Sequence, residues 1–260
     1  MTFCNPQYLR RLLALLSPSI RPSALRLLRF TPSLKHQAEI AYWRNEWVSG
    51  SFHNDYYRRT MLGIAGETDD AFLQGKIVAD FGCGPQGSLA WATAARLRIG
   101  IDVLADNYSA FDIRSHDMVY VSSTERTIPL PSNFVDIMFT MNAVDHVSKL
   151  RVICDEIRRV IIPGGKFFGS FNMYEPATFC EPQTLTEERL HEVLLKYLNV
   201  QFFKIAPPGP IGDWYGPSHC GEYIDKPVPH AHLWVRAIKP LSYQCGVAAS
   251  CSRKLNEFFA

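Results

Sequence analysis

From residue 76 onward, short apolar strands alternate with helical segments, and this alternation constrains the fold more than any other feature of the sequence. Strands are expected over residues 77–81, 99–103, 118–121, 135–140, 166–171, 200–205 and 231–238. Helices are expected between them, over residues 89–97, 107–111, 149–160 and 187–198. Such alternation is typical of a parallel sheet covered by helices on both faces. The sequence therefore predicts an α/β fold with a mostly parallel sheet of seven strands.

Two stretches of different composition precede the domain that we expect at residues 76–240. Residues 1–36 contain six Arg or Lys residues and no Asp or Glu, with leucines at helical spacing. We expect a basic helical arm there, which packs on its own domain or a partner, contacts a membrane surface or serves as a targeting peptide. Residues 37–75 form an aromatic-rich helical cap segment, and residues 241–260 form a C-terminal tail.

Charge and cysteine usage limit the classes of partner and compartment. The formal net charge is +2, but beyond the arm there are 21 basic and 25 acidic residues, so no basic stripe for nucleic acid is expected. No stretch approaches the roughly 18–20 apolar residues of a membrane-spanning helix. The seven cysteines are odd in number and form no C-x-x-C pair, which favours reduced thiols. We expect a cytoplasmic protein, with peripheral membrane contact through the arm as an alternative.

A glycine-rich turn follows the first expected strand, where residues 80–87 read DFGCGPQG. Gly82, Gly84 and Gly87 satisfy the G-x-G-x-x-G pattern, in which glycines allow a tight turn and close approach of a ligand. Asp102 ends the next strand, where a carboxylate can accept hydrogen bonds from ribose hydroxyls. This pattern alone fits a nicotinamide cofactor as well as another adenosyl cofactor.

Two residues of the turn favour a cationic ligand over a dinucleotide. Asp80 lies two residues before the first glycine, where its carboxylate would repel a pyrophosphate and suit an ammonium or a sulfonium group. Pro85 removes one N–H group from the turn, which weakens an anion cradle. A nicotinamide-dependent oxidoreductase is therefore the less favoured alternative.

The motifs in order resemble those of the class I S-adenosylmethionine-dependent methyltransferases, close to the small-molecule group called type 11. The resemblance rests on DFGCGP at 80–85, GIDV at 100–103, IPLPSNFVD at 128–136, NAVDHV at 142–147 and RVIIPGGK at 159–166. It covers about residues 76–171 and implies a Rossmann-like fold, S-adenosylmethionine as cofactor and methyl transfer to a small-molecule acceptor. A hydroxyl is the favoured acceptor group, on a sugar, a lipid-linked or a secondary-metabolite intermediate.

The resemblance also implies a set of cofactor-binding residues, among which Asp102 holds the ribose. The family commonly has an acid after the third strand to contact the adenine amino group, and here Ser123 or Glu125 would take that place. The expected cofactor-binding residues are Asp80, Gly82, Gly84, Pro85, Gly87, Asp102, Val103, Ser123, Glu125 and Asn142.

Catalytic and acceptor-binding residues must lie at the carboxyl ends of the strands. His146, with Asp145 beside it, is the candidate for a general base or an acceptor-orienting group, and the alternative is a histidine with a structural role. A long loop before the last strand and the cap segment supply candidate acceptor contacts at Tyr56, Trp214, Tyr215, His219 and His230. The spacing of the histidines and Cys220 matches no zinc site, so no metal is expected. The remaining alternative is a non-catalytic, methyltransferase-like subunit for assembly or membrane recruitment.

Overall fold

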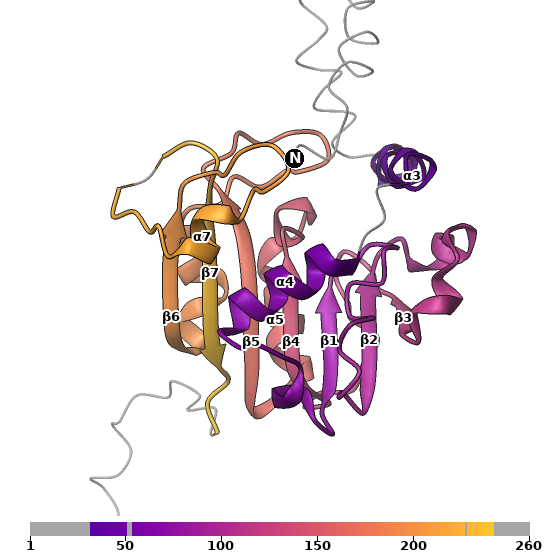
Figure 1. Ribbon diagram of the computed structural model, residues 1–260, viewed down its shortest axis with the longest axis horizontal. Helices are drawn as coiled ribbons and strands as arrows, with labels where there is room; N and C mark the ends of the chain where they lie inside the picture. Colours follow the sequence, from indigo (N-terminus) through magenta and orange to yellow (C-terminus); the bar gives the residue numbers. More distant parts are fainter. Residues whose placement is uncertain (1–31, 51–53, 227, 242–260) are drawn as a thin grey trace, which may run out of the picture.

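The computed structural model describes residues 32–50, 54–226 and 228–241. Its centre is a seven-stranded sheet with the order β3-β2-β1-β4-β5-β7-β6 (Figure 1). The strands are β1 (Ile77–Phe81), β2 (Leu97–Asp102), β3 (Val119–Ser122), β4 (Val135–Met141), β5 (Ile161–Met173), β6 (Asn199–Ala206) and β7 (Ala231–Ile238). The five strands from β3 to β5 pair in parallel, whereas β7 runs antiparallel to both β5 and β6. The predicted mostly parallel α/β sheet is confirmed.

The α-helices are α3 (Pro32–Val48), α4 (Asn54–Ala65), α5 (Leu150–Val160), α6 (Glu187–Val193) and α7 (Gly216–Cys220). The 3₁₀ helices are η1 (Ala71–Leu73), η2 (Ala105–Phe111), η3 (Ile113–His116), η4 (Val144–His146) and η5 (Leu195–Tyr197). In Figure 1, α3 lies beyond the carboxyl ends of β1 and β2, whereas α4 crosses the face of the sheet. The boundary expected between the arm and the cap segment, at residues 36 and 37, lies inside α3, which continues to Val48 without a break.

Both faces of the sheet are buried, which explains why its central strands are continuous apolar runs. All five residues of β1 are buried, as expected for a parallel strand covered on both sides. On one face, Ile153 and Ile157 of α5 join the larger core cluster with α6. On the other face, Met61 and Ile64 of α4 pack with Trp234 of β7 in a second cluster.

The order of the strands fixes where a ligand can bind. From β1 the chain moves outward through β2 and β3, and then returns to the other side of β1 with β4 and β5. In open α/β sheets, ligands bind at the carboxyl ends of the strands where this order reverses. Here that point lies between β1 and β4, where Phe81 pairs with Ile101 on one side and Thr140 on the other.

The helix expected over residues 89–97 is absent, and that prediction is wrong. The segment forms successive turns instead, in which Ala90 N–H donates to Gly87 and Ala92 N–H donates to Leu89. Gly84 and Gly87, which precede this segment, have left-handed φ values of 59° and 72°. Asp70 then accepts a hydrogen bond from Ala94 N–H at 2.9 Å, which holds the turns against the core.

Other expectations concern the membrane, the thiols and the chain ends. None of the described helices is both long and apolar enough to cross a bilayer. Cys83, Cys154 and Cys220 carry free thiols, but Cys180 is disulfide-bonded, so the expectation of reduced thiols is wrong for that residue. The basic arm up to residue 31 and the tail from residue 242 lie outside the described residues.

Candidate functional site

A cavity opens at the carboxyl ends of β1, β2 and β4, at the point where the strand order reverses, and α3 forms its roof. It is lined by segments far apart in the sequence, from α3, the glycine-rich turn, the ends of β2 and β3, and the segment after β4. Among the sequence-predicted site residues, it brings together Gly82, Asp102, Val103, Ser123, Glu125, Asn142 and His146.

The glycine-rich turn has no space for a side chain at Gly82 or at Gly84. Gly82 has a φ of 76°, and a Cβ there would lie 2.1 Å from the Cβ of Ala143. Gly84 has a φ of 59°, and its Cβ would lie 2.8 Å from the ring of Trp43 on α3. Gly87, in contrast, packs against His116 and not against the cavity, while Pro85 is buried within the turn. The turn therefore approaches the cavity with bare backbone at Gly82.

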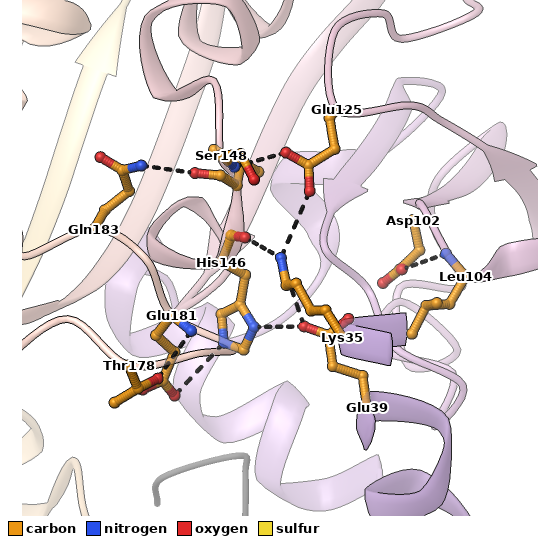
Figure 2. A network of polar contacts seen from close by, with 11 residues as sticks. Lys35, Glu39, Asp102, Leu104, Glu125, His146, Ser148, Thr178, Glu181 and Gln183 are labelled. Atoms are coloured by element: carbon orange, nitrogen blue, oxygen red, sulfur yellow. Dashed lines mark hydrogen bonds and ion pairs between the residues drawn. The ribbon is translucent and has the colours of Figure 1, made fainter. Parts of the chain in front are cut away.

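Asp102 is held rigidly at the end of β2. Its carboxylate accepts hydrogen bonds from Gly84 N–H at 3.1 Å and from Leu104 N–H at 2.9 Å, the second of which is drawn in Figure 2. Burial raises the pKa of Asp102, although these two hydrogen bonds act in the opposite direction. A carboxylate that is fixed in a cavity wall is well suited to accept hydrogen bonds from the hydroxyls of a ribose.

Asp80 is buried in β1, does not line the cavity, and has a hydrogen-bond partner for only one of its two carboxylate oxygens among the described residues. One oxygen accepts a hydrogen bond from Ser88 Oγ at 2.6 Å, and the other has no partner among the described residues. Burial raises the pKa of Asp80 to about 8. A buried carboxylate with an open acceptor position is stabilised by a nearby cation. Together with the bare turn, it fits a cofactor that carries ammonium and sulfonium groups.

The segment after β3 supplies the wall next to Asp102. Ser123 donates its backbone N–H to the carbonyl of Asp102 at 3.0 Å and lines the cavity. Glu125 also lines it, but its carboxylate accepts a hydrogen bond from Ser148 N–H at 2.6 Å and lies 3.6 Å from Lys35 Nζ (Figure 2). Ser123 therefore has fewer competing contacts than Glu125 for binding a ligand.

His146 lies on η4, and its nearest carboxylate comes from α3 and not from its neighbour in sequence. Its Nδ1 lies 3.0 Å from Glu39 Oε1, and its Nε2 lies 3.8 Å from Glu181 Oε1 (Figure 2). Burial lowers the pKa of His146, but the hydrogen bond to Glu39 and the nearby carboxylates outweigh it, so the pKa is raised. Asp145 is buried, does not line the cavity, and has one oxygen without a partner among the described residues.

Behind the cavity, Asn142 begins a chain of uncharged polar contacts. Its Nδ2 donates to the hydroxyl oxygen of Tyr215 at 2.6 Å, and Ser170 Oγ donates to the same oxygen at 3.1 Å. The ring of Tyr215 packs edge-on against His232, with 4.9 Å between centroids. Burial lowers the pKa of His232 to about 4 and raises that of Tyr215 to about 12, so both are neutral near pH 7.

The remaining candidate acceptor residues are spread over the other side of this chain. The ring centroid of Tyr56 lies 6.1 Å from that of Tyr215, and Trp214 lies 6.5 Å from His232. His219 packs against Trp234 with 5.1 Å between centroids, whereas His230 is exposed, with Nδ1 3.4 Å from Glu175. Tyr56, Trp214, Tyr215, His219 and His230 are not among the residues that line the cavity. Within the described part of the chain, no three His, Cys, Asp or Glu residues group as metal ligands.

Sequence reasoning missed the contribution of α3 to this site. Lys35, Glu39, Tyr42 and Trp43 line the cavity, and their spacing places them on one face of a helix. Lys35 and Glu39 also look like an ordinary exposed pair at positions i and i+4. The spacing could have indicated that these residues share a face, but no local signal indicates that this face meets His146.

Comparison with known proteins shows the same fold and a matching family. Residues 79–169 match the model of a methyltransferase domain family, type 11. No curated protein sequence matches the chain. A solved S-adenosylmethionine-dependent methyltransferase from Mesorhizobium loti is 17% identical, with 64% of this chain and 92% of that chain covered and a TM-score of 0.50.

Two further solved structures with this fold are described as having different activities. A possible histamine N-methyltransferase from Thermotoga maritima is 14% identical over 77% of this chain and 95% of that chain, with a TM-score of 0.52. The (4+2)-cyclase SpnF is 18% identical over 71% of this chain and 81% of that chain, with a TM-score of 0.52. Likeness of fold alone therefore does not define the reaction. The family match covers residues 79–169, about a third of the chain, and includes β2 to β4 at the cavity, so the chain resembles the class I S-adenosylmethionine-dependent methyltransferases, whose cofactor is S-adenosylmethionine.

Proposed function

We propose that the protein transfers the methyl group of S-adenosylmethionine to a hydroxyl group of a small, uncharged acceptor, with His146 as general base. The observation that carries this proposal is that Asp102, the bare backbone of Gly82 and the imidazole of His146 line one cavity. Bound S-adenosylmethionine supplies an electrophilic methyl group on its sulfonium. The protein then has to orient the two reactants and remove a proton from the acceptor.

Several residues would hold the cofactor at the carboxyl ends of β1 and β2. Asp102 would accept hydrogen bonds from the ribose hydroxyls. Gly82, which has no side chain, would allow the cofactor to approach the protein backbone closely. Asp80, with its open oxygen and raised pKa, would ionise as a cationic ligand arrives, because an opposite charge favours the charged form. Val103, Ser123 and Glu125 would border the adenine.

His146 would take the proton of the acceptor hydroxyl on Nε2. Its Nδ1 faces Glu39, and donation of that proton leaves the lone pair of the neutral ring on Nε2. Because the pKa of His146 is raised, its conjugate acid is stabilised as the hydroxyl proton arrives. Asp145 would act on His146 through its charge, whereas Glu39 makes a hydrogen bond with the ring.

The uncharged chain behind the cavity supports an uncharged acceptor. Asn142 lines the cavity and keeps one oxygen without a partner among the described residues. Tyr215, Ser170 and His232 behind it are neutral polar groups. Such groups recognise hydroxyls and amides by hydrogen bonding. A sugar, a lipid-linked or a secondary-metabolite hydroxyl would each fit this description.

Calorimetric titration tests the cofactor half of the proposal. We expect S-adenosylmethionine to bind and NADH not to bind. Replacing Asp102 by Ala should weaken binding by about 10–100-fold, since a hydrogen bond to a charged group contributes roughly 1.5–3 kcal/mol. Asp106→Ala is the matched control, because Asp106 is an exposed carboxylate on the neighbouring η2. Equal effects of the two substitutions would contradict a role for Asp102 in binding.

Release of S-adenosylhomocysteine tests the acceptor half. We would assay neutral hydroxyl compounds beside matched amines and carboxylates of the same carbon skeleton. Turnover confined to the hydroxyl members, with a loss of about 10²–10⁴-fold in His146→Ala, is expected for general base catalysis. Turnover of the amines or carboxylates, or full activity of the variant, would refute this part of the proposal.

The basic arm adds a separate expectation about location. Residues 1–31 contain five arginines and no acidic residue, which would suit reversible contact with an anionic membrane surface. Sedimentation with anionic vesicles should then depend on salt and disappear when residues 1–31 are removed. Equal sedimentation of the full and shortened chains would contradict membrane contact through the arm.

A further inference from the structure

One face of α3 contacts both the cofactor turn and the candidate base. Lys35, Glu39, Tyr42 and Trp43 all line the cavity from this helix. Trp43 packs against the glycine-rich turn, because a Cβ built on Gly84 would lie 2.8 Å from its ring. One turn earlier on the same face, the carboxylate of Glu39 meets the imidazole of His146. The helix thus spans the two functional parts of the cavity.

The contact between α3 and η4 is ionic and largely buried. Glu39 Oε1 lies 3.0 Å from His146 Nδ1, and the two side chains are 10% and 18% exposed. Lys35 Nζ donates to the carbonyl oxygen of His146 and lies 3.6 Å from Glu125 (Figure 2). A buried ion that loses its partner costs several kcal/mol. These contacts therefore require α3 to be packed against η4.

Four charged residues from the described part of the chain lie around His146. Glu39 and Lys35 come from α3, Asp145 comes from η4, and Glu181 comes from the segment after β5. Glu39 makes the hydrogen bond to the ring, whereas Glu181 lies at 3.8 Å and Asp145 acts through its charge. A change at Glu39 should consequently alter the imidazole more than a change at the other two carboxylates.

We propose that Glu39 is the positioning residue for the base His146, so that packing of α3 over the cofactor cavity assembles the base. This inference rests on the proposed function of His146. The carboxylate of Glu39 accepts a hydrogen bond from Nδ1–H of His146 and thereby selects the tautomer whose lone pair is on Nε2. Because Trp43 and Glu39 are on one helix face, a cofactor that is held under α3 and the oriented base belong to one packed arrangement.

Titration of His146 by nuclear magnetic resonance tests this proposal without a known acceptor. The ring resonance of His146 is identified by its loss in His146→Gln. In the wild-type protein with S-adenosylhomocysteine bound, we expect a midpoint above the ordinary value of about 6.5. In Glu39→Gln the midpoint should fall by about one pH unit or more, because an opposite charge at this distance shifts a pKa by roughly 1–3 units.

Glu46→Gln is the matched control, since Glu46 is on the same helix but its recorded electrostatic partner is Tyr42. We expect the His146 midpoint to be unchanged in that variant. Equal midpoints in the wild-type protein and Glu39→Gln would overturn the proposal. If Glu39→Gln fails to fold, a wild-type midpoint at or below about 6.5 would also overturn it.

The outcomes separate this inference from the proposed function. Calorimetric binding of S-adenosylmethionine with an unresponsive His146 titration would remove the role of Glu39 and leave cofactor binding intact. The proposed function would instead be refuted if the wild-type protein does not bind S-adenosylmethionine and the His146 midpoint is the same in the wild-type protein and in Glu39→Gln. A merely structural role of Glu39 predicts lower stability of Glu39→Gln with no change in the His146 midpoint.

Discussion

Two parts of the ligand face are built in different ways. We call the part around Asp80 and Asp102 the cofactor half, and the part around Asn142, Ser170 and Tyr215 the acceptor half. In the cofactor half, Asp80 and Asp102 bond to groups only 8 and 18 positions away along the chain. In the acceptor half, Tyr215 receives hydrogen bonds from Asn142 and Ser170, which are 73 and 45 positions away. The first half also contains the buried carboxylates Asp80 and Asp102, whereas Tyr215 and His232 of the second are neutral near pH 7. In the proposed function, the cofactor would thus be recognised by a short local motif, and acceptor selectivity would depend on the tertiary structure around it.

The largest expected effect tests whether the cofactor half depends on the space at its turn. Gly82→Ala should lower the free energy of unfolding by about 2–4 kcal/mol and abolish cofactor binding, because left-handed strain adds to overpacking. The new Cβ would lie 2.1 Å from that of Ala143. Urea unfolding and calorimetric titration would measure the two effects.

Gly75→Ala provides the control for that change. Gly75 has a φ of 70°, close to the 76° of Gly82, but a Cβ there would meet nothing within 4 Å. We expect a loss of about 1 kcal/mol from backbone strain alone and unchanged cofactor binding. Equal losses in the two variants would show that the clash with Ala143 contributes nothing.

The next effect tests the charge of the cofactor half through pH. The folded pKa of Asp80 is raised to about 8, so its contribution to stability is full below its unfolded value of about 3.9 and is lost as pH rises through about 8. Without cofactor, the thermal midpoint of the wild-type protein should therefore fall between about pH 5 and pH 8 relative to that of Asp80→Asn. Asp106→Asn should retain the wild-type slope. Identical slopes in the wild-type protein and Asp80→Asn would contradict the burial of an unstable carboxylate.

Tyr215→Phe tests whether the acceptor half is energetically separate from the cofactor half. The substitution leaves Asn142 Nδ2 and Ser170 Oγ without their shared acceptor, which should cost about 1–2 kcal/mol. Because Tyr215 itself does not line the cavity, the dissociation constant for S-adenosylmethionine should change by less than about twofold. Tyr223→Phe, which removes a single hydrogen bond of 3.3 Å to Ser218, should be milder. A large loss of cofactor affinity in Tyr215→Phe would show that the two halves are energetically coupled.

The smallest expected effect concerns the edge of the acceptor half. His230 is exposed and lies 3.4 Å from Glu175, and exposed ion pairs contribute about 0–1 kcal/mol. Asn is the suitable replacement because His230 has a φ of 60°, which Asn tolerates. We expect His230→Asn to change the unfolding free energy by less than about 0.5 kcal/mol and to leave turnover unchanged. A marked fall in turnover would extend the acceptor half to this position.

The same contrast explains what the sequence could predict. Apolar runs such as residues 77–81 and 231–238 predict strands because burial on both faces leaves a local pattern. The helix expected over residues 89–97 is replaced by successive turns that are bonded to Asp70, a contact from outside the segment that its composition does not indicate. Glu39 was missed as the partner of His146 because 107 positions separate the two residues. The adjacent Asp145 was the natural candidate in the sequence, yet its side chain does not reach the ring.

The reversed direction of β7 has a consequence for how this protein could be altered. Ala206 at the end of β6 pairs with His232 near the start of β7, so the intervening loop begins and ends at neighbouring points. The entropic cost of a loop closed in this way grows slowly with its length. Changes of length are therefore best placed near Ile211 and Gly212, which are exposed, whereas Tyr215 and Ser218 of the same loop are buried and have to be kept. In directed evolution, diversity placed at these exposed positions would leave the buried contacts of the loop intact.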